Sequence, residues 1–335
     1  MAEPTMEDVA RLAGVGVATV DRVINKRAKV RPQTAQKVLD AAQTLGFRRV
    51  GLIQRRIAEQ QTTPRLGVVL QQPTPFYREL AQAVIDACDG RAKCRIVNLT
   101  SLTPQHIATE LLALGKDVDA IALVAADHPL ISQAIDTLAQ RGVPVFALVS
   151  DLSADACAGY IGLDNRKVGR SAAWTMAKLA TPGKVGLILG SHRYLCQEQC
   201  EISFRAYLRE YAPQLQVLET LPSLEDKDLA QAATLELLDR HPDLVGIYVA
   251  GGGIEGVLEA LRLQRPTGLV VVCHDLTEVT RAALTDDLVQ MVLSHPLEWM
   301  SVRLVESMQG FLAGHGRQER NQIILPCLIH TAANL

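Results

Sequence analysis

The sequence has no hydrophobic run long enough to cross a bilayer, and neither sign of charge dominates its 335 residues. A membrane-spanning helix needs about 20 consecutive apolar residues. A secretory signal begins with positive charge followed by an apolar stretch, whereas this chain begins with the acidic residues Glu3, Glu7 and Asp8. These absences exclude a membrane protein and a secreted protein, so we expect a cytoplasmic one.

Cysteine motifs are also missing. The seven cysteines are odd in number and scattered, which excludes a disulfide framework and a paired Cys-x-x-Cys zinc site. Cys196 and Cys200 lie four residues apart in an expected helix, a spacing compatible with a redox or metal role, although small core side chains are the simpler interpretation. We expect no metal and no cofactor.

The motifs of common enzyme classes are absent as well. The chain has no Gly-x-Ser-x-Gly elbow, no His-Glu-x-x-His and no Gly-x-Gly-x-x-Gly after a first strand. Gly251-Gly-Gly253 is rich in glycine, but it lacks the Lys-Ser/Thr of a nucleotide-binding loop. We therefore expect that the protein is not an enzyme.

Residues 5–25 have the pattern of two short helices joined by a tight turn. Thr5 is placed to cap the first helix together with Asp8, three positions on. Gly14 ends that helix because glycine readily adopts left-handed backbone angles, and a second helix follows over 17–25. The expected core residues of the two helices are Val9, Ala10, Leu12, Val20, Val23 and Ile24.

A third helix is predicted from Pro32 to Leu45, ended by Gly46. Residues 1–62 contain 11 Lys or Arg against 6 Asp or Glu, so positive charge is concentrated at this end of the chain. Lys29 and Arg31, between the second and third helices, are suited to phosphate contacts. Three helices with this charge predict a helix-turn-helix headpiece that binds double-stranded DNA.

The headpiece resembles that of the lac-repressor/galactose-repressor (LacI/GalR) family. The resemblance is carried by Asp8-Val-Ala-Arg-Leu-Ala-Gly14, Arg22-Val-Ile-Asn25, Val30-Arg-Pro-Gln-Thr34 and Leu45-Gly-Phe47. It implies that the protein binds a near-palindromic operator as a homodimer. The DNA-contacting residues implied for the second helix are Val17, Ala18 and Arg22 at base edges, and Thr19 and Asn25 at the backbone or bracing the turn.

One departure from that family lies in the second helix. Asp21 stands where the family usually has Ser, and a carboxylate repels phosphate. We therefore expect Asp21 to pair with Arg22, with Lys26 or with a cytosine amino group. Thr5, at the start of the first helix, completes the set of expected contacts in the headpiece.

A charged linker follows over 50–64. In the resembling family this stretch forms a hinge helix on DNA, with an apolar side chain wedged into the minor groove. The family's usual pattern, Asn-x-x-Ala-x-x-Leu, is not evident here, and Gly51 disfavours a helix. Leu52 and Ile57 are the candidate wedges.

From Arg65 onward, short β-branched runs alternate with amphipathic stretches, which predicts an α/β domain with parallel sheets flanked by helices. The expected strands are 66–70, 121–125, 143–149, 184–189, 245–249, 269–273 and 289–293. In such sheets ligands bind beyond the carboxyl ends of the strands.

This region resembles the type I periplasmic sugar-binding-protein fold, which the LacI/GalR family uses as its effector domain. The resemblance implies a headpiece at 1–49, a hinge at 50–64 and a two-lobed effector-binding and dimerisation domain at 65–335. The first lobe would comprise about 65–160 and 295–318, and the second lobe about 161–293 and 319–335. The effector would lie in the cleft between the lobes.

The polar and aromatic residues at the strand ends form the expected effector site. Aromatic rings stack on the apolar face of a sugar, and carboxylates accept hydrogen bonds from vicinal hydroxyls. The candidate residues are Phe76, Tyr77, Asp127, Ser150, Asp151, Asp164, Asn165, Arg193, Gly251, Gly252, Asp275 and His295.

Structural roles are the alternative for several of these residues. Asp164 and Asp275 would serve as helix caps, His295 as an ordinary loop histidine, and Phe76 and Tyr77 as packing residues. Gly251-Gly-Gly253 replaces the family's usual Asn-Asp pair, which would leave backbone amides to bind an acceptor or anionic group.

We therefore expect a sequence-specific DNA-binding regulator, a repressor of a carbohydrate or polyol utilisation operon, controlled allosterically by a small sugar-like effector. The alternatives are control by a protein partner or an anionic metabolite, and an α/β enzyme.

Overall fold

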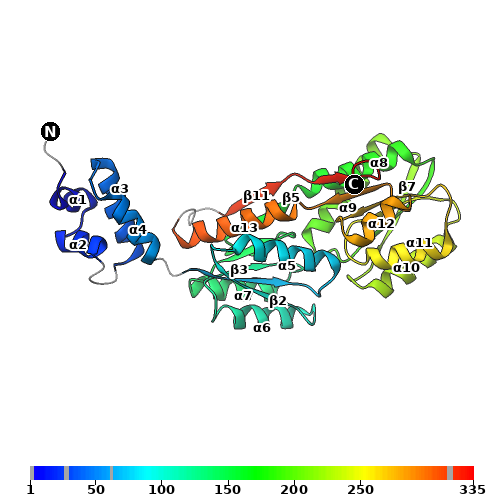
Figure 1. The fold of residues 1–335 in the computed structure, drawn as a ribbon. Coiled ribbons are helices and arrows are strands. Elements are labelled where there is room, and N and C mark those ends of the chain that lie inside the picture. The colour runs from blue at the N-terminus through cyan, green and yellow to red at the C-terminus, as the bar shows by residue number, and fades with distance from the viewer. Residues whose placement is uncertain (1–3, 26–29, 61–62, 315–319) are drawn as a thin grey trace. The chain divides into compact units, whose positions relative to one another are not determined.

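The computed structural model describes residues 4–25, 30–60, 63–314 and 320–335. The chain divides into two compact units (Figure 1). The first comprises Met1–Pro64 and Gln309–His315, and the second comprises Arg65–Met308 and Gly316–Leu335.

The first unit begins with the predicted helix-turn-helix, formed by α1 (Met6–Ala13) and α2 (Val17–Asn25). The capping box is confirmed, because the Thr5 hydroxyl oxygen accepts from the Asp8 amide and the Asp8 carboxylate accepts from the Thr5 amide. Gly14 adopts the left-handed conformation with φ of 65°, as a residue that ends a helix before a tight turn must. The turn therefore follows from the chemistry of its end residues.

The headpiece has a fourth helix in addition to α3 (Pro32–Leu45). This helix, α4 (Val50–Gln60), packs against α2 and α3. Ile53 is 0% exposed and Ile57 is also buried, both in the same hydrophobic core as α1, α2 and α3. Burial of these two isoleucines outweighs the weak helix propensity of Gly51. The expectation for Leu12 was wrong: it is 53% exposed, and Val9 and Ala10 alone of the three are buried.

The second unit contains two six-stranded sheets, which confirms the predicted α/β class. The first sheet has the order β11 (Asn321–Leu325), β5 (Gly159–Leu163), β4 (Val145–Leu148), β3 (Ala120–Leu123), β1 (Arg65–Leu70), β2 (Lys93–Asn98). The second has the order β12 (Leu328–His330), β10 (Met291–Ser294), β9 (Val270–His274), β8 (Leu244–Val249), β6 (Gly183–Leu189), β7 (Leu215–Pro222). Among the described strands, all pairings are parallel except that of β10 with β12.

Helices follow most of the strands, as parallel connections require. They are α5 (Pro75–Cys88), α6 (Pro104–Leu114), α7 (Pro129–Gln140), α8 (Asn165–Leu179), α9 (Leu195–Tyr211), α10 (Lys227–Arg240), α11 (Ile254–Gln264), α12 (Glu278–Thr285) and α13 (Leu297–Leu312). Each sheet with its helices forms one lobe.

The sheet pairings differ from the expected lobe division in two places. β5 extends to Leu163 and pairs with β4 in the first sheet, and β11 pairs with β5 in the same sheet. The first crossing between lobes therefore falls near Asp164, and only β12 of the segment 319–335 joins the second sheet. Burial explains the position of β5, because all five of its residues are buried in the first lobe.

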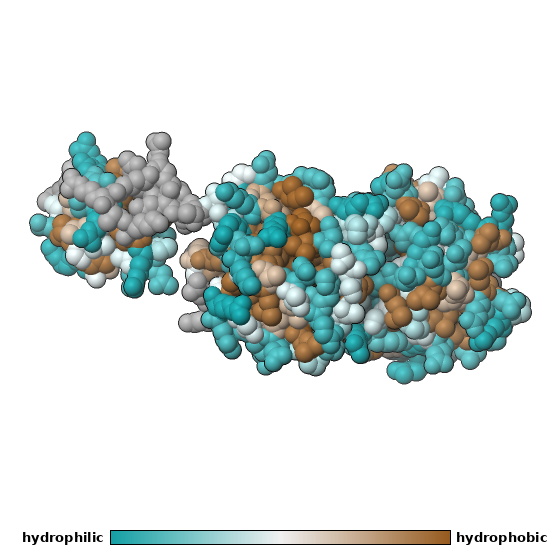
Figure 2. Space-filling view, turned by 90° about the horizontal axis from the view of Figure 1, so that it is seen from below, coloured by the Kyte–Doolittle hydropathy of each residue, from teal (hydrophilic) through white to brown (hydrophobic). Residues whose placement is uncertain are grey.

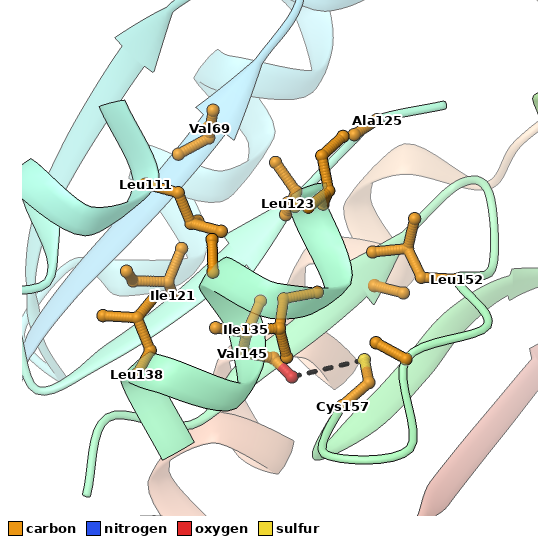
Figure 3. Close-up of a cluster of buried hydrophobic side chains, with 14 of the residues drawn as sticks. Val69, Leu111, Ile121, Leu123, Ala125, Ile135, Leu138, Val145, Leu152 and Cys157 are labelled. Carbon is orange, nitrogen blue, oxygen red and sulfur yellow. Dashed lines mark hydrogen bonds between the residues drawn. The ribbon is translucent and has the colours of Figure 1, made fainter. Parts of the chain in front are cut away.

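The core of the first lobe lies between its sheet and the helices α6 and α7 (Figure 3). Leu111 and Leu138 from the helices pack with Val69, Ile121 and Leu123 from the strands. Cys157 belongs to this core, and its thiol donates to the Val145 carbonyl at 3.4 Å. This cysteine is the small buried side chain that the sequence led us to expect.

The surface of the second unit mixes hydrophilic and hydrophobic residues on the face shown in Figure 2. Among the helices in the described ranges, none is both long and apolar enough to cross a membrane.

Tyr248 and His274 form a polar pair within the second lobe, near the carboxyl ends of β8 and β9. The Tyr248 hydroxyl and His274 Nε2 are 2.7 Å apart, and the Tyr248 ring stacks on Phe204 with centroids 4.7 Å apart. Burial lowers the pKa of His274 to about 4 and outweighs the negative charge of Asp275, which acts in the opposite direction. His274 is therefore neutral near pH 7.

Two adjacent residues test whether α4 belongs to the headpiece core. Ile53→Ala should reduce the local stability of the headpiece by about 2–5 kcal/mol, because it leaves a cavity in a packed core. Leu52→Ala, at a neighbouring position that is 37% exposed, should change it little. Hydrogen exchange of headpiece amides in the full-length protein measures both. Equal protection in the two variants would contradict the packing of α4.

The lowered pKa of His274 predicts an acid-dependent loss of stability. The unfolded chain takes up the proton near pH 6.5, before the folded protein does. Stability is thus fully present above pH 6.5 and declines between pH 6.5 and pH 4. His274→Gln should remove about 1–3 kcal/mol of the difference in unfolding free energy between pH 7 and pH 4.5. Urea unfolding at both values checks this, with His106→Gln as the control that keeps the full difference.

Candidate functional site

The outward face of α2 presents the side chains expected to read DNA. Val20, Val23 and Ile24 are buried in the headpiece. Val17 is 41% exposed, and Ala18 and Arg22 are also exposed. Helical spacing therefore separates a core-facing side from a solvent-facing side, as a recognition helix requires.

Polar contacts within the headpiece use three of the predicted DNA-binding residues. Asn25 Nδ2 donates to Asp21 Oδ1 at 2.6 Å. This bond supplies a neighbour for the Asp21 carboxylate that we had not considered, and it braces the last turn of α2. The Thr5 hydroxyl donates to Asp8 Oδ2 at 2.7 Å, so it serves the helix cap.

The remaining predicted DNA contacts have different surroundings. Thr19 is half-buried in α2, and Arg31 is exposed immediately before α3. Lys29 and Lys26 lie outside the described residues. Burial revises the expectation for Ile57, which faces the headpiece core, and leaves Leu52 as the exposed apolar candidate.

Hydrogen bonds between described residues join the two lobes across the cleft. Gln71 Nε2, after β1, donates to the Tyr194 hydroxyl at 2.7 Å. The Asp127 amide donates to the Arg193 carbonyl at 2.8 Å, and the Cys196 amide donates to Ser150 Oγ at 3.4 Å. Asp127, Ser150 and Arg193 therefore meet at the cleft as predicted, but two of these three bonds come from backbone amides.

A cavity of about 340 Å³ contains three of the predicted effector residues. Phe76 at the start of α5, Asp275 after β9 and His295 after β10 all line it. The rings of Phe76 and His295 are 5.6 Å apart between centroids. The other lining residues are Leu276, Ser294, Pro296, Leu297, Glu298, Trp299, Leu328 and His330.

Asp275 and His295 form the charged centre of this cavity. Asp275 Oδ1 accepts from the His295 amide at 3.1 Å and lies 2.7 Å from His295 Nδ1. Burial opposes ionisation of Asp275, but the charge and hydrogen bonds of His295 outweigh it and lower the pKa of the carboxyl group. His295 Nε2 is buried with no hydrogen-bond partner among the described residues. A buried ring nitrogen of this kind is available to a ligand.

A smaller cavity of about 240 Å³ contains another part of the predicted set. Asp151, Asp164 and Asn165 line it together with Cys196. Asp164 caps α8 by accepting from the Lys167 amide at 3.2 Å, which is the structural role considered for it. Asp151 forms an ion pair with Arg320, and Asn165 Nδ2 donates to the Tyr160 hydroxyl at 3.3 Å.

The Gly252 amide after β8 is already occupied by a side chain, contrary to the expectation that it would bind a ligand. The Gly252 amide donates to Glu225 Oε1 at 3.3 Å, and Gln197 Nε2 donates to the same oxygen at 2.7 Å. Gly251 lies beside Gln197, and a Cβ atom there would be 2.6 Å from Gln197 Oε1. A carboxylate already occupies the place where an anion was expected, because the adjacent loop directs Glu225 into it.

Sequence reasoning missed several residues of the cleft. Gln71 and Tyr194 lie in strand-end loops where ligand contacts are expected, but their side chains were not singled out. Trp299 lies in the first turn of α13, beyond such a loop. Glu225 gave no such signal, because it follows the edge strand β7, which the sequence pattern did not reveal. Tyr77, which the sequence did single out, is buried beside Phe76 with ring centroids 5.0 Å apart.

Two known families match the chain over separate ranges. Residues 5–49 match the bacterial regulatory proteins of the lacI family, and residues 68–315 match the periplasmic binding protein domain.

Solved structures confirm the fold of the second region. A solute-binding protein of Agrobacterium vitis, bound to α-D-tagatopyranose, has a TM-score of 0.76 at 20% identity, covering 81% of this chain and 96% of that one. A solute-binding protein of Burkholderia graminis, in complex with D-arabinose, has the same TM-score and the same coverage at 22% identity.

Relatives in sequence include a protein named as an HTH-type transcriptional regulator and one named as a catabolite control protein. The HTH-type transcriptional regulator CelR of Thermobifida fusca is 29% identical over 79% of this chain and 78% of its own length. Catabolite control protein A of Priestia megaterium is 34% identical over 44% of this chain, and the match spans only 43% of that protein. With a matching headpiece and a matching two-lobed domain in one polypeptide, the chain belongs to the lacI family of bacterial regulatory proteins.

Proposed function

We propose that this protein is a repressor of a carbohydrate or polyol utilisation operon, and that a small sugar-like effector controls its affinity for operator DNA. The observation that carries the proposal is the cavity between lobes, where the paired Asp275 and His295 lie against the Phe76 ring. A carboxylate, a ring nitrogen and an aromatic face are the groups that bind a sugar. The protein would act in the cytoplasm as a homodimer and would catalyse no reaction.

The headpiece supports the DNA-binding half of the proposal. An exposed face on α2 with Arg22 matches the way a recognition helix enters the major groove. Two headpieces of a homodimer would read the two halves of a near-palindromic operator. Effector binding would favour one arrangement of the lobes over another and so change how well both headpieces fit.

The sugar class is supported by similarity and by chemistry. The two solute-binding proteins with this fold carry bound sugars in their structures. In this chain, Asp275 can accept hydrogen bonds from hydroxyl groups and His295 Nε2 has no partner among the described residues, while Phe76 and Trp299 line the same cavity as apolar rings. An anionic effector would meet the carboxylates Asp275 and Glu298 there, so we favour the neutral class over the anionic one.

Arg22 should determine sequence preference in the operator. Arg22→Ala should cost about 1–3 kcal/mol of discrimination at one base pair, because bidentate contacts to guanine would be lost. Fluorescence anisotropy on an operator selected from random DNA, and on single-base variants of it, measures this. Arg209→Ala, in the second unit, is the matched control. Unchanged selectivity in Arg22→Ala would show that Arg22 does not read a base.

Asp275 should be essential for the response to effector. Asp275→Asn keeps an oxygen that can accept from the His295 amide but removes the charge, so binding of a sugar should weaken about tenfold or more. Thermal shift with a panel of sugars and polyols, followed by operator release, provides the measurement. Asp239→Asn, exposed on α10, is the control. Equal shifts in both variants would place the effector elsewhere, and no shift in the wild type would favour a protein partner.

A further inference from the structure

Glu225 lies where three strand ends meet in the second lobe. It is two residues beyond Ser223, in the loop after β7, and its carboxylate reaches the ends of β6 and β8. A Cβ atom at Gly190 would overlap Glu225 Oε1, and a Cβ atom at Gly252 would overlap Glu225 Oε2. The absence of side chains at these two glycines therefore forms the notch that holds the carboxylate.

Hydrogen bonds fix the carboxylate in this notch. Gln197 Nε2 and the Gly252 amide donate to Oε1, while Gln197 Oε1 accepts from the Gly190 and Ser191 amides at 2.8 and 3.0 Å. Oε1 is thus held by the protein itself. Among the residues that the structure describes, no donor to Oε2 is found.

The backbone of this loop has a conformation that is unfavourable for its residues. Leu224 has φ of 53° and Glu225 has φ of 61°, both in the left-handed region that non-glycine side chains seldom adopt. Two such residues in succession cost free energy, and strain of this kind is typically retained at ligand sites. Here it turns the Glu225 side chain back over the strand ends.

The charge of Glu225 acts on residues of both lobes. Its charge raises the pKa of Tyr194 and Cys196 in the second lobe and of Tyr77 in the first, in each case after burial as the main cause. Burial raises the pKa of Glu225 itself, against the hydrogen bonds of Gln197 and Gly252. Within the described ranges, no Lys, Arg or His forms an ion pair with it.

We propose that Glu225 is a specificity-determining residue of the effector cleft, outside the lining of the Asp275–His295 cavity, whose Oε2 accepts hydrogen bonds from hydroxyl groups of a neutral effector and whose charge rejects phosphorylated ones. This inference rests on the proposed function. Glu225 supplies from the β7–α10 loop the carboxylate that the Gly251-Gly-Gly253 segment cannot supply. It also occupies the Gly252 amide that an anionic ligand would need.

The test compares neutral sugars with their own phosphates. The probes are D-glucose, D-allose, D-tagatose, D-arabinose and myo-inositol, together with the monophosphate of each. Thermal shift on the full-length protein identifies the binding probes, and titration calorimetry gives their affinities. The wild type should bind a neutral probe at least about tenfold more tightly than its monophosphate, because like charges would meet at Glu225.

Glu225→Gln isolates the role of Oε2. Glutamine keeps an Oε1 that accepts from Gln197 and Gly252, and replaces Oε2 by a donor of similar size. It should bind the neutral probe about tenfold to a hundredfold more weakly and should lose the discrimination against the monophosphate. Glu225→Asp should retain that discrimination while binding more weakly. Glu219→Gln, exposed on β7, should match the wild type.

Each other outcome overturns the inference. If Glu225→Gln binds and discriminates like the wild type while Asp275→Asn does not bind, Glu225 does not contact the effector although the proposed function stands. If the wild type prefers a monophosphate, the assigned ligand class is wrong and the effector function again stands. If no probe shifts the wild type, both the inference and the proposed sugar effector fail.

Discussion

Parallel pairing of the strands is the constraint on which the rest of this structure depends. Parallel strands place all their carboxyl ends on one edge of a sheet. Because the chain crosses between the two sheets after β5, between β10 and β11, and between β11 and β12, those edges are held together at one cleft. Asp275, His295 and Phe76 come from distant parts of the sequence and share one cavity for this reason. The site is a consequence of topology, and its chemistry is set by the residues at the strand ends.

The sequence predicted most of the strands that are buried inside the sheets, but it missed the edge strands and also β5, which is buried throughout and contains two glycines. β1, β3, β8 and β9 lie inside the sheets and have the continuous apolar pattern of buried parallel strands. β2 and β7 lie at the edges, and their residues are mostly half-exposed, so no apolar run marks them. Glu225 was missed for the same reason, since an unrecognised strand has no recognisable end. The partners of Asp275 and Gly252 depend on loop geometry, which pattern analysis does not supply.

In the headpiece, too, local helix propensity predicted some features and not others. Capping by Thr5 and Asp8 and the left-handed Gly14 follow from neighbours in sequence, and both were predictable. The packing of α4 was not, because Gly51 disfavours a helix locally while Ile53 and Ile57 gain burial only when α2 and α3 are already in place. Tertiary packing of the two isoleucines outweighs the unfavourable helix propensity of Gly51, as packing commonly does in short helices.

The bonds across the cleft that involve Gln71, Asp127 and Cys196 differ in how far they depend on side chains. Two of them begin at main-chain amides, those of Asp127 and Cys196, and every residue other than proline supplies such an amide. Substitution of the side chains that line the cavities would therefore leave this part of the contact between lobes in place. Substitutions of a few cavity side chains would therefore change which effector binds, while the main-chain hydrogen bonds between the lobes would persist.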